Sequence, residues 1–359
     1  MDRTVERSNS GTCRNLQLIL DSDRAIDTTV AVIIPYFQKK TGILRRALSS
    51  VLEQRLSPNT AIQIVVVDDG SPVPARTEVD GLNLPSNFRL QLIEQPNGGV
   101  AAARNTGLRQ VSEDTTYIAF IDSDDIWNPE HLSIALSALN AGYDYYFCNT
   151  LRIGSQDSYF SVVNFNPHIS SSCAIGDDVY EINKKFLFEF ALRTHVSQAP
   201  TVVYRRLVAH DVTFYEPLRT AGEDMLFLLQ VIWRCQRVCF SPAPHVTLGD
   251  GVNIWHNRFS WDAPEHRASQ LQCLIGSQEI KKSFTLSPEN KQYIDSNISC
   301  FRNFFAYLMV RWFLKTGQLG SKGIYDMSRN DPWFWLWYPL CILHVAICFP
   351  LGLYTPPDE

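Results

Sequence analysis

The chain has 359 residues, of which 45% are hydrophobic, and it carries a formal charge of −5. This size and composition suit one large folded domain with an additional segment. The acidic balance and the lack of a long Lys/Arg run argue against a nucleic-acid partner. Nine scattered cysteines without metal-ligand spacing indicate reduced thiols in the cytosol. Residues 1–29 are polar, contain no signal-peptide core and are expected to form a flexible leader.

Strands and helices are predicted to alternate in the first half of the chain. The apolar run Val30–Ile34, stopped by Pro35, predicts a buried parallel strand because both of its faces are apolar. Further strands are predicted at Ile62–Val67, Leu90–Ile93 and Tyr117–Ile121, and helices at Gly42–Gln54, at Val100–Leu108 and from Asn128 (N-cap) and Pro129 to Leu139. This alternation predicts an α/β fold with a mostly parallel sheet flanked by helices, which binds ligands beyond the carboxyl ends of its strands.

The pattern is less regular after Tyr143, where we expect the acceptor-binding half. The predicted elements are a strand at Tyr143–Cys148, a loop to about Val179, a helix near Ile182–Leu192, a strand near Thr201–Tyr204, a helix opened by Gly222-Glu223-Asp224, and two longer helices at Pro264–Lys282 and Pro288–Lys315. We therefore expect a leader in residues 1–29, a catalytic domain in 30–260, a helical extension in 261–330 and an apolar tail in 331–359.

The tail from Pro332 to Pro357 contains no Asp, Glu, Lys or Arg. Its length suffices for a membrane-spanning helix, although two prolines and a histidine interrupt it. The aromatic residues at its start suit the headgroup level of a bilayer. Three interpretations stay open: a spanning helix, a helix lying in the membrane surface, and a buried helix of a soluble domain. If the tail spans, the Lys and Arg residues before it place its N-terminal side in the cytoplasm.

Asp122 and Asp124 are the candidates for a donor and metal site. They lie two residues apart at the predicted end of a strand, where alternate side chains point the same way. A divalent cation that bridges the two phosphates of a nucleotide sugar prefers carboxylate oxygens. The pair can share one ion or divide the ion and the ribose between them. The alternative is that Asp and Ser here only start a turn and cap the next helix.

Phe37, Asp69 and Arg104 are candidates for the nucleotide pocket. Asp69 follows a buried strand, where a carboxylate can accept the imide hydrogen of a uracil-like base, or it belongs to an ordinary Asp-Gly turn. Phe37 offers a flat face for base stacking, although an aromatic residue at a strand end often belongs to the core. Arg104 lies near the donor or, in the alternative interpretation, on an exposed helix surface.

Gly222-Glu223-Asp224 precedes the apolar run Met225–Trp233 and is the candidate catalytic segment. A one-step displacement with inversion requires a carboxylate that takes the proton of the acceptor hydroxyl. We assign that role to Asp224 and include the adjacent Glu223 in the catalytic pair. Acidic residues in a first helical turn are also favoured by the macrodipole alone. His256 is a candidate metal ligand or phosphate contact, or else a structural hydrogen-bonding residue.

Taken together, these motifs resemble family 2 glycosyltransferases in order and spacing. The similar segments are Val32–Phe37, Val66–Ser71, Asn97–Gly99 with Ala103–Gly107, Phe120–Asp125 and Gly222–Asp224, within about residues 30–260. The resemblance implies a GT-A fold, an inverting displacement, Mg²⁺ or Mn²⁺, and a UDP-sugar donor. It implies these roles: Pro35 in the nucleotide-sugar site, Phe37 stacking on the base, Asp69 reading the base, Asp122 beside the ribose, Asp124 on the metal and Asp224 as the base.

This sequence also departs from the family pattern. Phe37 stands where the family commonly has Tyr, and Gln38 where it often has Asn, which keeps stacking but changes polar contacts. No Q-x-x-R-W motif follows the Glu-Asp pair, and no region with several membrane helices is present. These absences argue against a processive synthase and favour the addition of one sugar per encounter.

Two further stretches, Gly42–Leu48 and Gly251–Ile254, are most similar to succinoglycan-type exopolysaccharide glucosyltransferases of the ExoW kind. This resemblance implies glucose as the transferred hexose and a lipid-linked oligosaccharide or other glycan as the acceptor. It also implies a place at the cytoplasmic face of the inner membrane, either peripheral or through a single C-terminal anchor. The competing interpretation is a catalytically inactive sugar- or nucleotide-binding scaffold on the same fold, against which the three intact carboxylates at Asp122, Asp124 and Asp224 argue.

Two other enzyme classes are disfavoured by the sequence. A nucleotidyltransferase would show a Gly-rich phosphate loop near the first strand, and Pro35 to Gly42 contains none. A dinucleotide-binding enzyme would show G-x-G-x-x-G after a strand, which is also missing.

Overall fold

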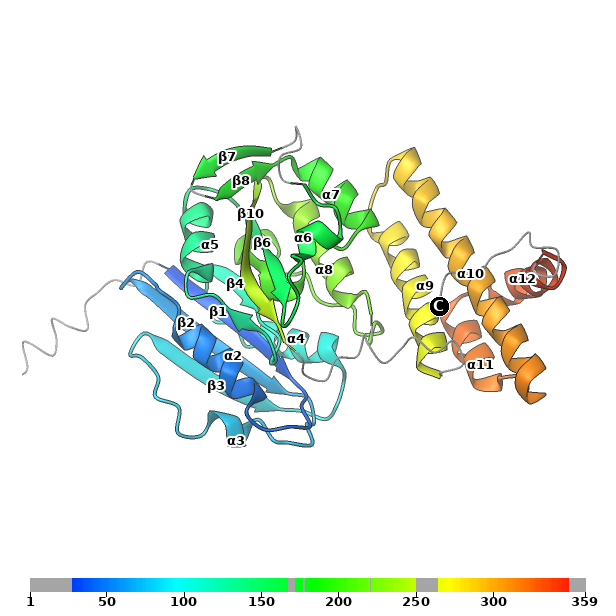
Figure 1. Cartoon of the computed structure of the whole chain (residues 1–359), viewed down its shortest axis with the longest axis horizontal. Helices are drawn as coiled ribbons and strands as arrows, with labels where there is room; N and C mark the ends of the chain where they lie inside the picture. The colour runs from blue at the N-terminus through cyan, green and yellow to red at the C-terminus, as the bar shows by residue number, and fades with distance from the viewer. Residues whose placement is uncertain (1–27, 167–171, 177, 220, 250–263, 349–359) are drawn as a thin grey trace, which may run out of the picture.

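The computed structural model describes residues 28–166, 172–176, 178–219, 221–249 and 264–348 (Figure 1). A sheet covered by helices forms the larger part of the molecule. Four helices from the end of the chain form a second part, which packs beside it (Figure 1).

A single ten-stranded sheet organises the larger part. Its strands are β1 (Thr28–Tyr36), β2 (Thr60–Asp68), β3 (Phe88–Glu94), β4 (Tyr117–Phe120), β5 (Ile126–Trp127), β6 (Tyr145–Arg152), β7 (Ser172–Gly176), β8 (Val179–Ile182), β9 (Val202–Arg205) and β10 (Val238–Leu248). The spatial order is β3-β2-β1-β4-β9-β6-β10-β8-β7, with β5 paired to β10. Strands β3, β2, β1 and β4 are parallel, whereas β9 runs antiparallel to both β4 and β6. The predicted α/β architecture with mostly parallel strands is confirmed.

Helices cover both faces of this sheet. They are α2 (Ile43–Leu52), α3 (Arg76–Val79), α4 (Val100–Arg109), α5 (His131–Asn140), α6 (Tyr159–Val162), α7 (Lys184–Arg193) and α8 (Glu223–Arg234). Alternate residues of β1 belong to different cores: Ile33 packs in the cluster with α4, α7 and α8, and Val32 and Ile34 pack in the cluster with α2 and α5. Because both faces are buried, β1 is a continuous apolar run.

We predicted that Pro35 would end strand β1. The strand instead continues through Pro35 to Tyr36. The amide of Ile121 donates to the carbonyl of Ile33, so Ile33 faces β4. Pro35, two residues further, faces the same side, and β4 has already ended at Phe120. The missing N–H of Pro35 therefore removes no hydrogen bond from the sheet.

Two other expectations for the first half of the chain need correction. Helix α5 begins at His131 and not at Pro129, because Asn128 forms a turn whose side chain accepts from the Glu130 amide, and Gln54 caps the Leu132 amide. The predicted loop before Val179 contains α6 and β7, two elements too short to produce a periodic pattern.

The second part consists of α9 (Pro264–Ser283), α10 (Pro288–Thr316), α11 (Ser321–Asn330) and α12 (Phe334–Cys348). The two long helices lie where the sequence predicts them. Buried residues of all four helices belong to the same hydrophobic cluster as α7 and α8, so this part shares a core with the sheet. Asp331 is 1% exposed; it accepts from the Arg302 guanidinium and from the indole N–H of Trp337, and this fixes α12 on α10.

Helix α12 forms the described part of the apolar tail. It is 15 residues long and contains Pro339. Among the residues that the structure describes, no helix combines the length and the apolarity that crossing a bilayer requires.

Candidate active site

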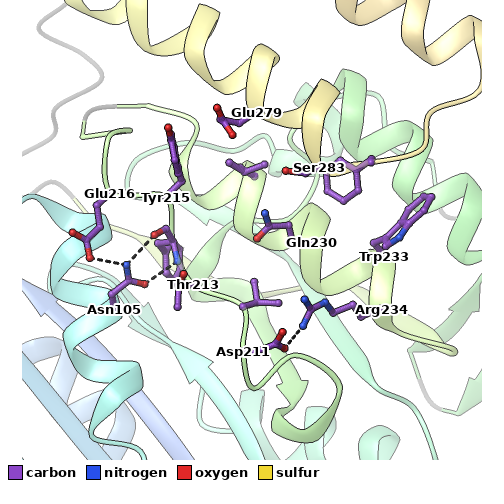
Figure 2. Close-up of a pocket in the computed structure, with 14 residues that line it drawn as sticks. Asn105, Asp211, Thr213, Tyr215, Glu216, Gln230, Trp233, Arg234, Glu279 and Ser283 are labelled. Carbon is purple, nitrogen blue, oxygen red and sulfur yellow. Dashed lines mark hydrogen bonds and ion pairs between the residues drawn. The ribbon is translucent and has the colours of Figure 1, made fainter. Parts of the chain in front are cut away.

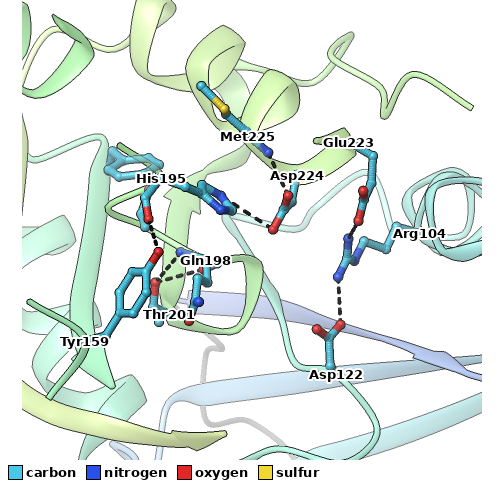
Figure 3. A network of polar contacts seen from close by, with 11 residues as sticks. Arg104, Asp122, Tyr159, His195, Gln198, Thr201, Glu223, Asp224 and Met225 are labelled. Carbon is cyan, nitrogen blue, oxygen red and sulfur yellow. Dashed lines mark hydrogen bonds and ion pairs between the residues drawn. The ribbon is translucent and has the colours of Figure 1, made fainter. Parts of the chain in front are cut away.

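Arg104 of α4 connects two of the predicted motifs (Figure 3). Its Nη2 donates to Oδ1 of Asp122 at 2.7 Å, just beyond β4, and its Nη1 donates to Oε1 of Glu223 at 3.3 Å, at the start of α8. The guanidinium also lies over the ring of Phe214, 5.2 Å from its centroid. The Arg104 side chain is only 3% exposed, which excludes the exposed-helix alternative. Segments more than a hundred residues apart thus meet on one buried cation.

The charges in this group perturb one another. Burial alone would lower the pKa of Arg104, but the carboxylates of Asp122, Glu223 and Asp224 raise that pKa above its ordinary value. Burial, followed by the charge of Asp224, raises the pKa of Glu223 to about 7, although Arg104 opposes this shift. Arg104 is therefore always charged, whereas Glu223 is only about half ionised near pH 7.

Asp224 is the more accessible member of the Glu-Asp pair. Its side chain is 21% exposed, against 11% for Glu223. Its Oδ1 accepts from the Met225 amide at 2.8 Å, and its Oδ2 lies 3.5 Å from Nε2 of His195 (Figure 3). The N-terminus of α8 favours a negative charge at this position. A partly exposed carboxylate beside a histidine is suited to accept a proton from a bound hydroxyl.

His195 was missed by the sequence reasoning. It follows α7, and its backbone carbonyl accepts from the hydroxyl of Tyr159 at 2.6 Å. A lone histidine between a helix and a strand carries no spacing signal, so only the fold reveals that it reaches Asp224.

The match to known proteins identifies the family. The model of glycosyl transferase family 2 matches residues 31–195. Succinoglycan biosynthesis protein ExoW of Rhizobium meliloti (strain 1021) is 32% identical over 278 residues, which cover 74% of this chain and 83% of that protein. The chain belongs to glycosyltransferase family 2.

Other relatives of this family 2 glycosyltransferase share parts of the chain or its fold. The poly(ribitol-phosphate) β-N-acetylglucosaminyltransferase TarS of Staphylococcus aureus (strain Mu50 / ATCC 700699) is 26% identical over 210 residues, 58% of this chain and 33% of TarS. The crystal structure of S. aureus TarS 1-349 in complex with UDP-GlcNAc superposes with a TM-score of 0.57 at 17% identity, covering 91% of this chain and 93% of that one. The GT-A fold expected from the sequence is confirmed.

Gln38, just beyond the end of β1, links two motifs of this glycosyltransferase. Its amide nitrogen Nε2 donates to the hydroxyl of Ser123, and its backbone N–H donates to the hydroxyl of Ser71. Its Oε1 is buried without a hydrogen-bond partner among the described residues. Gln38 therefore joins the Asp-Asp-Gly-Ser and Asp-Ser-Asp motifs. Phe37 beside it is partly exposed, and Pro35 is buried inside β1.

Asp69 lies in a cradle made by the Asn97-Gly98-Gly99 turn. Its Oδ1 accepts from the Gly98 amide and the Gln95 side chain, both at 2.7 Å, and its Oδ2 accepts from the Gly99 amide at 2.8 Å. The side chain is buried. A carboxylate has about four lone-pair positions, so a position on Oδ2 is left for a base N–H. The role of Asp69 in base reading stays a prediction.

Asp122 and Asp124 stay the candidate ligands for a divalent cation. Both follow β4 and are partly exposed, whereas Asp125 between β4 and β5 turns inward and accepts from the Gly249 amide at 2.8 Å. Burial, with the charges of Asp122 and Asp124, raises the pKa of Asp125 well above its ordinary value. A Cβ at Gly249 would lie 1.8 Å from the Asp124 carbonyl, so only glycine permits this close approach.

The ligand set available from the described residues is small. No group of three or more His, Cys, Asp or Glu side chains in that part of the chain is placed to hold an ion by itself. Mg²⁺ in nucleotide sites is commonly held by one or two carboxylates together with substrate phosphates, which matches this pair. The predicted ligand His256 lies outside the described residues.

Proposed function

We propose that this protein is a metal-dependent, inverting hexosyltransferase. In this proposal it moves glucose from a UDP-sugar onto a lipid-linked oligosaccharide or other glycan during exopolysaccharide biosynthesis. The observation that carries the proposal is the double ion pair of Arg104, which ties the donor-side Asp122 to Glu223, the residue next to the candidate base Asp224. The similarity to ExoW supports the biosynthetic context, and the TarS complex with UDP-GlcNAc supports a UDP-sugar donor.

The proposed reaction is a single displacement. The acceptor oxygen forms a bond to the anomeric carbon while the bond from that carbon to the UDP oxygen breaks, and UDP leaves with the electron pair. The acceptor proton goes to Asp224, whose partly exposed carboxylate is positioned by the Met225 amide and His195. Glu223, which is buried and paired with Arg104, has the role in this proposal of holding that guanidinium in place.

The diphosphate of the donor has to be bound without repulsion. Asp122 and Asp124 would hold a Mg²⁺ or Mn²⁺ ion that neutralises the phosphates of the departing UDP. Arg104, already neutralised by two carboxylates, adjusts the position of Asp122 and leaves little net charge for the phosphates themselves. Phe37 and Asp69 would bind the base, as the sequence predicts.

Calorimetric titration of the purified protein with UDP and with GDP, each with and without Mn²⁺, tests the donor assignment. We expect UDP binding that depends on Mn²⁺ and weak or no GDP binding. Asp124→Ala should abolish the metal dependence, whereas Asp224→Asn should bind UDP as the wild type does and lose release of UDP from UDP-glucose. Asp114→Asn, an exposed aspartate remote from these motifs, is the matched control.

The results separate the proposal from its alternative. Equal loss of UDP binding in the Asp124 and Asp224 variants would contradict the division of roles. Binding of UDP without turnover of any UDP-sugar, in the wild type as in Asp224→Asn, would favour the inactive scaffold.

The C-terminal helices supply a candidate surface for the membrane. Four residues of α12 recur at helical spacing and are 51–65% exposed, and two tryptophans near its start are 64% and 68% exposed. A contiguous apolar face of this kind is typical of an interaction site, and exposed tryptophans suit the headgroup level. These residues are Leu336, Leu340, Leu343 and Ile347, with Trp333 and Trp335. We propose that this face docks on the inner membrane.

Co-sedimentation with phosphatidylcholine/phosphatidylglycerol vesicles tests the docking. The double variant Leu336→Gln/Leu340→Gln should bind roughly tenfold more weakly, because two leucines no longer transfer from water to lipid. Leu207→Gln, in an exposed turn of the sheet domain, should bind as the wild type does. Equal binding of both variants would exclude this face as the membrane contact.

A further inference from the structure

A cavity of about 620 Å³ lies away from Asp224, between α8, the end of α9 and the segment that precedes α8 (Figure 2). The segment contributes residues 211–216, and α8 contributes its outer face after the first turn. This volume falls in the range of about 300–1,000 Å³ that is usual for small-molecule sites. Neither the donor site nor the candidate base contributes a residue to the lining.

The lining combines aromatic rings with two side chains, Trp233 and Gln230, whose polar groups have no hydrogen-bond partner among the described residues. Trp233 is 44% exposed, and its ring is held by Phe188 at 5.0 Å and Phe284 at 5.5 Å between centroids. Its indole N–H and the whole amide of Gln230, one turn earlier on α8, have no hydrogen-bond partner in the described part of the chain. Figure 2 shows Gln230 pointing into the space between Tyr215 and the end of α9.

The charge of the cavity excludes some ligand classes. Three acidic side chains line it: Asp211 is paired with Arg234, Glu279 is paired with Lys282 outside the lining, and Glu216 has no cationic partner among the described residues. The surplus of negative charge disfavours phosphates, and thus nucleotides and sugar phosphates. A fixed aromatic face next to an amide and carboxylates instead suits a neutral ligand with apolar C–H faces and many hydroxyl groups.

The cavity is connected to the ion pair of the active site. The side chain of Asn105 on α4 bonds both the amide and the carbonyl of Phe214 at 2.8 Å, and its Nδ2 bonds Glu216 at 3.0 Å. Phe214, which lines the cavity, supports the guanidinium of Arg104 with its ring. A ligand in the cavity would therefore contact the segment that also positions Arg104.

We propose that this cavity is a second carbohydrate site, which binds a neutral oligosaccharide apart from the reacting sugar. Trp233 and Tyr215 supply the faces for sugar rings, and Gln230 supplies the hydrogen bonds to hydroxyl groups. The proposal does not depend on the donor or on Asp224, because none of the lining residues belongs to the proposed reaction centre.

Titration calorimetry with cellotetraose, laminaritetraose and lactose, in the absence of nucleotide, tests the site. We expect saturable binding of at least one of these sugars, weakened roughly fivefold in Gln230→Ala through the loss of about 1 kcal/mol of hydrogen bonding. Gln236→Ala, an exposed glutamine on the same domain but outside the cavity, should bind as the wild type does. Asp224→Asn should also retain the binding.

Two results would overturn the proposal. One is the absence of saturable binding for all three sugars, and the other is equal binding in Gln230→Ala and Gln236→Ala. Thermal unfolding of each variant verifies that it is folded. UDP titration is measured separately. If UDP binds and no oligosaccharide does, only the second carbohydrate site is contradicted. If an oligosaccharide binds and UDP does not, only the proposed function is contradicted.

Discussion

The substitution Glu223→Gln should make the free energy of unfolding less sensitive to a rise in pH. Glu223 has a pKa of about 7 in the folded protein and an ordinary value of 4.5 when unfolded. Between these two pKa values Glu223 is protonated in the folded chain and ionised in the unfolded chain. The free energy of unfolding therefore falls as the pH rises toward 7 and stays lowered above it. Since one pKa unit is worth about 1.4 kcal/mol, the wild type should lose roughly 2 to 3 kcal/mol between about pH 5 and about pH 8 through this residue.

Urea unfolding of wild type and variant across this pH range measures the effect. As the pH rises, the free energy of unfolding of Glu223→Gln should increase by that amount relative to the wild type. The weakened contact with Arg104 also destabilises the variant, but that contribution is the same at every pH. Glu113→Gln, an exposed glutamate, serves as the control and should give a flat difference curve. A flat curve for Glu223→Gln would show that Glu223 ionises normally, and the reasoning from its burial would then be wrong.

Three further substitutions test contacts of the structure. His195→Ala should lower kcat roughly fivefold while the Kd for UDP stays constant, because it removes one weak contact to the candidate base; an equal change in Kd would point to a general structural defect. Asn105→Ala should cost about 2 kcal/mol in urea unfolding, since it leaves the buried amide and carbonyl of Phe214 unpaired. Asp331→Asn should cost about 3 kcal/mol by removing the charge partner of Arg302, and a loss below about 1 kcal/mol would show that this pair does not hold α12 in place.

The first half of the fold was predictable because its elements are long and its apolar pattern is consistent. β1, β2 and β4 are buried on both faces and read as apolar runs, the Asp69-Gly70 turn follows β2, and the Asp122-Ser123-Asp124 cluster follows β4. β10 was not predicted, since Pro242 and Pro244 lie inside it and proline normally excludes a central strand. The structure accommodates them at register shifts around Pro244. Such bulges are set by tertiary packing and leave no local pattern.

The candidate site was predictable as a set of carboxylates but not as a network. Asp122 and Asp124 were predicted from their position after a strand, and Asp224 from its position at the start of a helix. The sequence left Arg104 undecided between the donor site and an exposed surface, because neither alternative has a distinct local pattern. Only the close approach of α4, β4 and α8 shows that it is buried between two carboxylates. His195 depends in the same way on a contact across the fold.

The position of Arg104 limits which parts of the two halves of the enzyme can change in sequence. Its partner Asp122 belongs to the regular parallel half, and its partner Glu223 belongs to the irregular half that would bind the acceptor. Removing either carboxylate leaves a buried guanidinium undercompensated, so the junction is costly to change. The acceptor half can alter its loops and its outer cavity while α8 stays fixed to the donor half through this side chain and through the shared core, where Phe227 packs on Phe120. A change of acceptor therefore need not move the candidate base relative to the donor, which is the geometric condition that a single displacement imposes.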